Sequence, residues 1–192
     1  MTRCGRWIGP CVALFVTAGA VAAEELTAGI RDMSTIANAR GESRILFRVP
    51  DLGLPDNALI LRATLEFTVD TVPLALEEQI QVHPVTTAWT AEAVSWTTGW
   101  QTAGGDIEPD FYSHVDVDLS RGRHTIGVDL TGLLKEQLEE GLFTDGFLMT
   151  VPPYIGEGIP AASAARYLSV GTATLRVSYR EVSAPVRTTR SG

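Results

Sequence analysis

The stretch LRATLEFTV, residues 61–69, alternates apolar and polar side chains without a break. Its apolar members share one parity and its polar members the other: Leu61, Ala63, Leu65, Phe67 and Val69 against Arg62, Thr64, Glu66 and Thr68. Successive side chains of a strand point to opposite faces, so this period of two predicts an antiparallel strand with one buried and one wet face. The segment therefore favours an all-β protein.

The same period recurs along the chain between turn signals such as LGLPDNA, TAGGD and SRGR. The further expected strands cover residues 44–49, 78–85, 91–96, 114–119, 124–130, 146–151, 166–170 and 172–179. About nine short strands are close to the eight of a jelly roll. The predicted fold is therefore an all-β antiparallel β-sandwich of jelly-roll type.

One short helix is expected to interrupt the strands. The segment DLTGLLKEQLEEG, residues 129–141, has Thr131 as a candidate N-cap and Gly141 as a candidate C-terminal stop. Leu134 and Leu138 lie one turn apart, which indicates an amphipathic helix. We expect it to plug one open end of the sandwich.

The first 23 residues have the order of a secretory signal. Arg3 and Arg6 precede an apolar run over residues 7–18, and small residues end at Ala23, where we prefer cleavage over Ala22. The run is too short to span a bilayer, although a retained anchor is the alternative. We expect a secreted chain, extracellular or periplasmic and associated with the cell surface, with no membrane span once the signal is removed.

The predicted organisation has a single folded domain after the signal. An N-terminal segment covers residues 24–39, the sandwich covers 40–181, and a flexible polar tail covers 182–192. Both cysteines, Cys4 and Cys11, lie in the signal, so the mature chain has no thiol for a disulfide or a metal.

The mature chain is strongly acidic. Of 15 basic residues, Arg3 and Arg6 leave with the signal, so 13 remain against 23 acidic residues, a formal charge of −10. A field of that sign argues against nucleic acid or an anionic membrane as a partner, so we expect neither.

Several stretches, taken in order, resemble DNRLRE-type domains. RILFRVPDLGLPDNALILRATLEF is similar to the opening of that family, and WQTAGGD and ATLRVSY are similar to later stretches. The family's signature W-x-E-x-x-V-[ST]-W is matched by Trp89, Glu92, Val94, Ser95 and Trp96. The resemblance covers residues 40 to 180 and implies a secreted β-sandwich related to carbohydrate-binding modules.

The aromatic residues divide into expected core and candidate ligand contacts. Parity and the family signature place the following in the core: Phe47, Leu65, Phe67, Trp89, Val94 and Trp96. Loop aromatics could stack on sugar rings, and outward arginines could bind sugar carboxylates. These candidates are Trp100, Phe111, Tyr112, Tyr154, Arg48 and Arg62. The alternative is ordinary loop packing and a solvated strand face, which we favour.

An acidic stretch is the one candidate metal site. Asp106, Asp110, Asp116 and Asp118 lie in GGDIEPDFYSHVDVD, and oxygen-rich loops suit a structural calcium. Solvated acids are the favoured alternative because no EF-hand spacing is present. We therefore expect no cofactor, with a structural calcium as the alternative.

Three functions follow as hypotheses. The first is a non-catalytic module that binds extracellular or cell-surface polysaccharide. The second is a structural or adhesive envelope protein that assembles with itself, as a homo-oligomer, or with a surface partner. The third and least favoured is a glycan hydrolase or lyase, since the chain has no HExxH, G-x-S-x-G or Walker motif.

Overall fold

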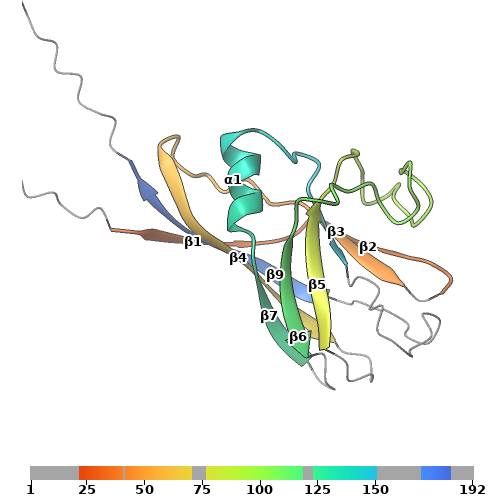
Figure 1. Ribbon diagram of the computed structural model, residues 1–192. Coiled ribbons are helices and arrows are strands. Elements are labelled where there is room, and N and C mark those ends of the chain that lie inside the picture. Colours follow the sequence, from red (N-terminus) through yellow and green to blue (C-terminus); the bar gives the residue numbers. More distant parts are fainter. Residues whose placement is uncertain (1–21, 41, 71–76, 119–122, 151–169, 183–192) are drawn as a thin grey trace, which may run out of the picture.

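The computed structural model describes residues 22–40, 42–70, 77–118, 123–150 and 170–182 (Figure 1). Within these ranges the chain forms nine strands and one helix. In chain order they are β1 Glu24–Gly29, β2 Met33–Ala37, β3 Ser43–Phe47, β4 Ala58–Asp70, β5 Glu77–Pro84, β6 Ser113–Asp118, β7 Arg123–Asp129, α1 Thr131–Glu139, β8 Phe147–Thr150 and β9 Val170–Glu181.

The strands form two antiparallel sheets. The first has the order β1-β9-β4-β7 and the second the order β2-β3-β8-β5-β6. When β2 is set aside, each strand lies in the other sheet from the one before it, except β6, which pairs with β5 in the second sheet. This is the arrangement of a jelly roll, with β2 added at one edge. The prediction of an all-β antiparallel sandwich with one short helix is confirmed.

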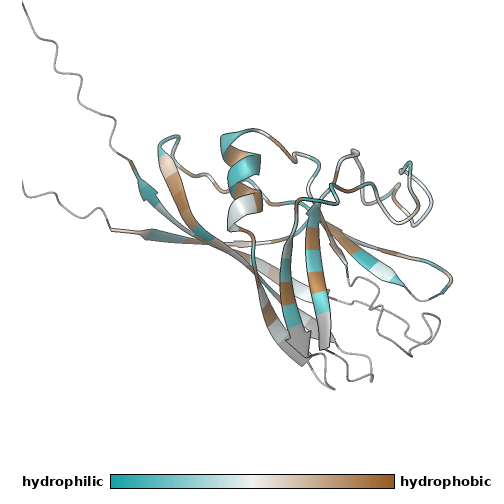
Figure 2. Ribbon diagram, viewed as in Figure 1, coloured by the Kyte–Doolittle hydropathy of each residue, from teal (hydrophilic) through white to brown (hydrophobic). Residues whose placement is uncertain are grey.

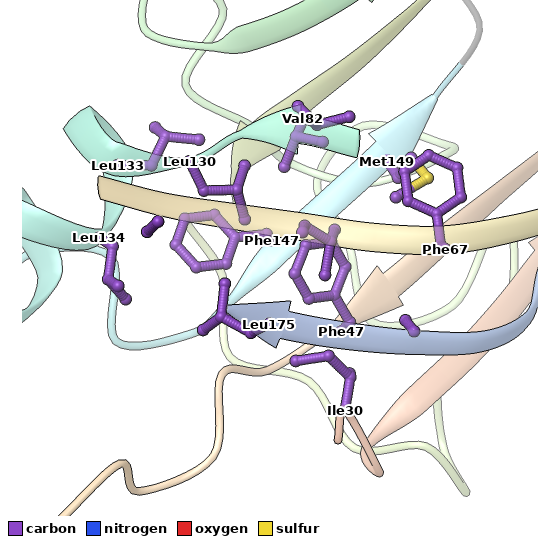
Figure 3. Packing of buried hydrophobic residues seen from close by; sticks show 14 of the residues in the cluster. Ile30, Phe47, Phe67, Val82, Leu130, Leu133, Leu134, Phe147, Met149 and Leu175 are labelled. Carbon is purple, nitrogen blue, oxygen red and sulfur yellow. The ribbon is translucent and has the colours of Figure 1, made fainter. Parts of the chain in front are cut away.

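The main core lies between the two sheets. Alternation along β4 puts Leu65 and Phe67 on its inner face, and both are buried, as Phe47 of β3 is. The Phe47 and Phe147 rings of the opposing sheet lie 5.6 Å apart by their centroids and fill the middle of this layer (Figure 3). Figure 2 shows the same alternation of hydrophilic and hydrophobic residues along β5 and β6.

The helix closes one end of this core, with Leu133 and Leu134 buried and Leu138 47% exposed. It begins at Thr131 itself, so the N-cap is Leu130 and the expected Thr131 cap is wrong. The Thr131 hydroxyl instead accepts a hydrogen bond from the Ala63 backbone N–H at 2.9 Å. The side chain thus ties the helix to β4 next to the register shift between Ile60 and Arg62.

Residues 91–96 and the N-terminal segment differ from the sequence prediction. Residues 91–96, expected as a strand, form turns instead, and most of the expected strand 166–170 lies outside the described residues. The N-terminal segment supplies two unexpected edge strands, β1 against β9 and β2 against β3. Edge strands are held mainly by backbone pairing, so they need few apolar side chains to mark them in a sequence. Among the described residues, no helix combines the length and apolar composition of a membrane span.

Candidate binding face

A long segment covers half of the outer face of the five-stranded sheet. We call residues 85–107 the tryptophan loop; its two ends meet in an antiparallel bridge between Val85 and Ile107. Trp89 of this loop is 5% exposed. It belongs to a second buried cluster in which the sheet contributes Ile36, Leu46 and Leu148, and Val94, Trp96, Trp100 and Ile107 pack against this cluster as partly buried residues. The tryptophans of the signature therefore pack on the outside of a sheet.

Two arginines hold this loop, Arg44 in β3 and Arg48 directly after it. The Arg48 guanidinium lies 4.3 Å from the centre of the Trp89 ring and donates to the Trp89 carbonyl oxygen. Arg44 lies 4.9 Å from the Trp96 ring and donates to the Gly104 carbonyl oxygen at 2.8 Å. A guanidinium over an indole is stabilised by the ring quadrupole. The Arg48 side chain, a candidate ligand contact, is thus engaged inside the protein.

Asp106 closes the loop from within. Its carboxylate accepts from the backbone N–H groups of Gln101 and Thr102 at 2.8 and 2.7 Å and from the Thr87 hydroxyl at 2.8 Å. The Gln101 bond is the main cause that holds the pKa of Asp106 below its ordinary value. These hydrogen bonds connect the two ends of the tryptophan loop.

The other candidate calcium ligands do not join Asp106. Asp110 is exposed, and Asp116 lies on β6, where it accepts from Gln79. The side chain of Asp118 lies outside the described residues. In the part of the chain that the structure describes, no group of three or more acidic or histidine side chains could hold a metal ion.

The candidate aromatic contacts are also dispersed. Trp100 packs on the tryptophan loop and donates its indole N–H to the Ser95 carbonyl oxygen at 2.8 Å. Phe111 lies against Phe143, with 5.4 Å between ring centroids. Tyr154 lies outside the described residues. The structure therefore does not bring these three side chains into one platform.

Tyr112 has a different environment. Its ring is 42% exposed and stacks on His83 of β5, with 4.9 Å between ring centroids. The ring of His114, on β6, lies 5.9 Å away. These residues belong to the half of the sheet's outer face that the tryptophan loop does not cover, formed by β5 and β6. We call this surface the polar face, and its members are Gln79, Gln81, His83, Tyr112, His114 and Asp116.

Strand alternation builds the polar face. Ile80 and Val82 of β5 are completely buried on the inner side, so the residues between and beside them point outward. The register pairs Gln79 with Asp116 and Gln81 with His114, which places β5 and β6 side chains in adjacent rows.

Hydrogen bonds connect these side chains into one row. Gln79 donates to Asp116 at 3.3 Å, and Gln81 donates to Gln79 at 2.5 Å. The two nitrogens of His83 lie 3.1 Å from the Gln81 side-chain oxygen and 3.1 Å from the Glu108 carbonyl oxygen. A row of polar groups beside an exposed ring can orient a polyhydroxylated ligand and stack on it.

Arg62 lies elsewhere, on the outer face of the four-stranded sheet. With Arg176, Glu66 and Glu25 it lines a shallow hollow of about 270 Å³. Arg176 is already paired with Glu66 at 2.8 Å. The two candidate arginines, Arg48 and Arg62, therefore do not form a common site with Tyr112.

Sequence reasoning did not identify the two glutamines and two histidines of the polar face as site residues. The outward parity of His83 and His114 was visible, but β5 and β6 are separated by the whole tryptophan loop. Nothing in the local pattern indicated that these two strands pair.

No protein-family model matches the chain, and no curated protein matches it. The resemblance to DNRLRE-type domains stays a prediction.

Proposed function

We propose that this protein is an exported, non-catalytic module that binds extracellular or cell-surface polysaccharide on its polar face. The observation that carries the proposal is Tyr112, an exposed ring at the head of a row of hydrogen-bonding side chains on an open sheet face. Sugars offer flat apolar faces for stacking and hydroxyls for hydrogen bonds, and the polar face offers a partner for each. The secretory signal and the family resemblance in the sequence support the same function.

The charge distribution favours a neutral sugar over an acidic one. Asp116 stands at one end of the row, and the whole chain carries a formal charge of −8. The positive charge that acts on His83, that of Arg44, is engaged with Glu42 at 3.1 Å and with the Gly104 carbonyl. A uronate carboxylate would therefore meet the like charge of Asp116, while the Arg44 guanidinium is already engaged.

Affinity electrophoresis of the mature chain through gels that contain different soluble polysaccharides tests the proposal. We expect retardation on at least one neutral glycan. Tyr112→Ala should weaken this binding tenfold or more, because truncating a contact aromatic removes most of its stacking energy.

Phe111→Ala is the matched control. Phe111 precedes Tyr112 directly and is similarly exposed, at 37%, but its ring packs on Phe143 away from the polar face. We expect this variant to bind like the wild type. Equal mobility in every gel, or equal binding by Tyr112→Ala and the wild type, would contradict the proposal.

A second candidate function is assembly into an envelope structure. β1 and β2 are the terminal strands of their sheets, so each leaves one backbone edge without a partner strand among the described residues. Such edges can add a strand from another chain. Light scattering of the mature chain with and without residues 24–39 tests this, and a concentration-independent monomer in both cases would exclude it.

A further inference from the structure

The row of hydrogen bonds on the polar face has acceptors at both ends. At the buried end, the Glu108 carbonyl oxygen faces the Nδ1 of His83, which is 5% exposed. At the other end stands the carboxylate of Asp116, on the exposed surface. Between them lie His83, Gln81 and Gln79, joined by successive contacts.

Counting hydrogens shows that this row is one proton short when His83 is neutral. Four contacts join the five groups, and each contact needs one hydrogen. A neutral imidazole and each glutamine amide can place one donor and one acceptor in the row, so the three inner groups supply three hydrogens. A carbonyl and a carboxylate supply none. Only the protonated imidazole, which donates from both nitrogens, completes all four contacts.

The missing hydrogen belongs at the exposed end. Two facing acceptors cost most where water cannot reach them, so His83 keeps its donor on the Glu108 carbonyl and accepts from Gln81 through Nε2. In the structure both glutamine amides have the orientation that completes the row for a protonated imidazole, with Gln79 donating to Asp116 and the Gln81 oxygen facing Nε2. With a neutral imidazole both amides turn over, and the side-chain oxygen of Gln79 then faces the carboxylate of Asp116. Two acceptors at the surface can be satisfied by any group that brings two O–H donors.

Burial favours this neutral state. Desolvation lowers the pKa of His83, the hydrogen bond to the Glu108 carbonyl opposes the shift, and the positive charge of Arg44 adds to it. The other groups that face His83 are the stacked Tyr112 ring and the amide of Gln81. In the neutral state the row therefore has its open contact between Gln79 and Asp116, in place of the hydrogen bond that the structure has there.

We propose that Gln79 and Asp116 form a subsite for two adjacent hydroxyls of a sugar, and that protonation of His83 closes it. The inference rests on the proposed function and gives it a chemical class of ligand, a vicinal diol. The diol donates one O–H to each acceptor in the neutral state. When His83 gains a proton, the amides reverse, Gln79 donates to Asp116 and the two donors of the diol lose one acceptor. Because coupling between two binding events is reciprocal, the diol must in turn disfavour the protonated imidazole.

Side-chain ¹⁵N NMR of the histidines, followed against pH with and without methyl α-D-mannopyranoside, tests the subsite. In the wild type we expect the sugar to lower the pKa of His83 and to bind about tenfold more weakly for each pH unit below that pKa, because only the neutral fraction is competent. The permethylated sugar keeps the ring and lacks O–H donors, so it should leave the titration unchanged.

Asp116→Asn is the decisive variant. An amide at this exposed position supplies the fourth hydrogen, so the row is complete with a neutral His83 and the pKa should no longer respond to the sugar. Asp110→Asn removes an exposed carboxylate outside the row and should behave like the wild type. A sugar-independent His83 titration in the wild type, or an equal response in Asp116→Asn, would overturn the subsite.

The two proposals fail in different ways. Glycan binding that needs Tyr112 but ignores both pH and Asp116→Asn removes the subsite and leaves the proposed function. A His83 response to the sugar without any Tyr112-dependent glycan retention supports the subsite and removes the proposed function.

Discussion

The outer face of the five-stranded sheet has two halves of opposite character. Over β2, β3 and β8 it carries apolar side chains and is covered by the tryptophan loop, whereas over β5 and β6 it carries polar side chains and, among the described residues, the loop does not reach it. The strand sequences differ accordingly: SRILF and FLMT have consecutive apolar residues, and EEQIQVHP alternates. A strand that is apolar on both faces needs a cover on both faces. The covered half therefore stabilises the fold, and the open half is available for a ligand.

The largest expected effect comes from removing the centre of the covered half. Trp89→Ala should lower the free energy of unfolding by about 3–5 kcal/mol, the usual cost of truncating a buried aromatic side chain. It also removes the indole donor to the Asp145 carbonyl, a 2.7 Å bond, and the ring beneath Arg48. Urea unfolding followed by circular dichroism measures this change.

Tyr112→Ala is the control from the open half, where we expect a change within about 0.5 kcal/mol. Equal losses in the two variants would abolish the distinction between a structural and a functional half.

A smaller effect is expected where the loop backbone touches the sheet. Gly105 has φ +110°, and a Cβ at this position would lie 2.6 Å from the Cδ1 atom of Leu148. Gly105→Ala therefore combines backbone strain with a clash and should cost about 2–3 kcal/mol in the same unfolding assay.

Gly99→Ala separates the two causes. Gly99 also has a positive φ, +92°, but an added Cβ would meet no atom within 4 Å. This variant should lose only the part due to strain, about 1 kcal/mol. A loss as large as that of Gly105→Ala would show that close packing of the loop on the sheet is unimportant.

The sequence predicted the strands more successfully than the partners of their side chains. Alternation in residues 61–69 correctly indicated β4 and its buried residues Leu65 and Phe67. The period of two also suggested a strand at 91–96, but that segment is a loop over the sheet. Trp89 is buried there by contacts with residues far away in sequence, and a local pattern carries no information about such contacts.

The candidate site was harder still to predict from the sequence. Of the aromatic candidates within the described ranges, Tyr112 alone lies on the polar face, because Phe111 and Trp100 are paired with neighbours that only the folded chain supplies. Arg48 and Arg44 have outward-facing side chains on the same sheet, which parity indicated. That these outward guanidinium groups lie against tryptophan rings depends on where a 23-residue loop returns to the sheet.

The smallest effect on the free energy of unfolding should come from protonation of His83 in the open half. Burial holds the pKa of His83 below its ordinary value of 6.5. As the pH falls through 6.5, the unfolded chain takes up a proton at this residue while the folded chain does not, so the free energy of unfolding decreases. Asp106, whose pKa is lowered by its bond from Gln101, contributes stability that is lost only in more acidic solution, below about its ordinary value of 3.8.

Unfolding midpoints measured in urea between pH 5 and 7.5 should therefore decline toward acid in the wild type and be flatter in His83→Gln. His114→Gln, which changes an exposed histidine of the same face, should keep the wild-type slope. Trp89→Ala should shift the whole curve down without changing its slope, because the covered half holds the fold and the open half takes up the proton. A slope that vanishes in Trp89→Ala but persists in His83→Gln would reverse this assignment of the two halves.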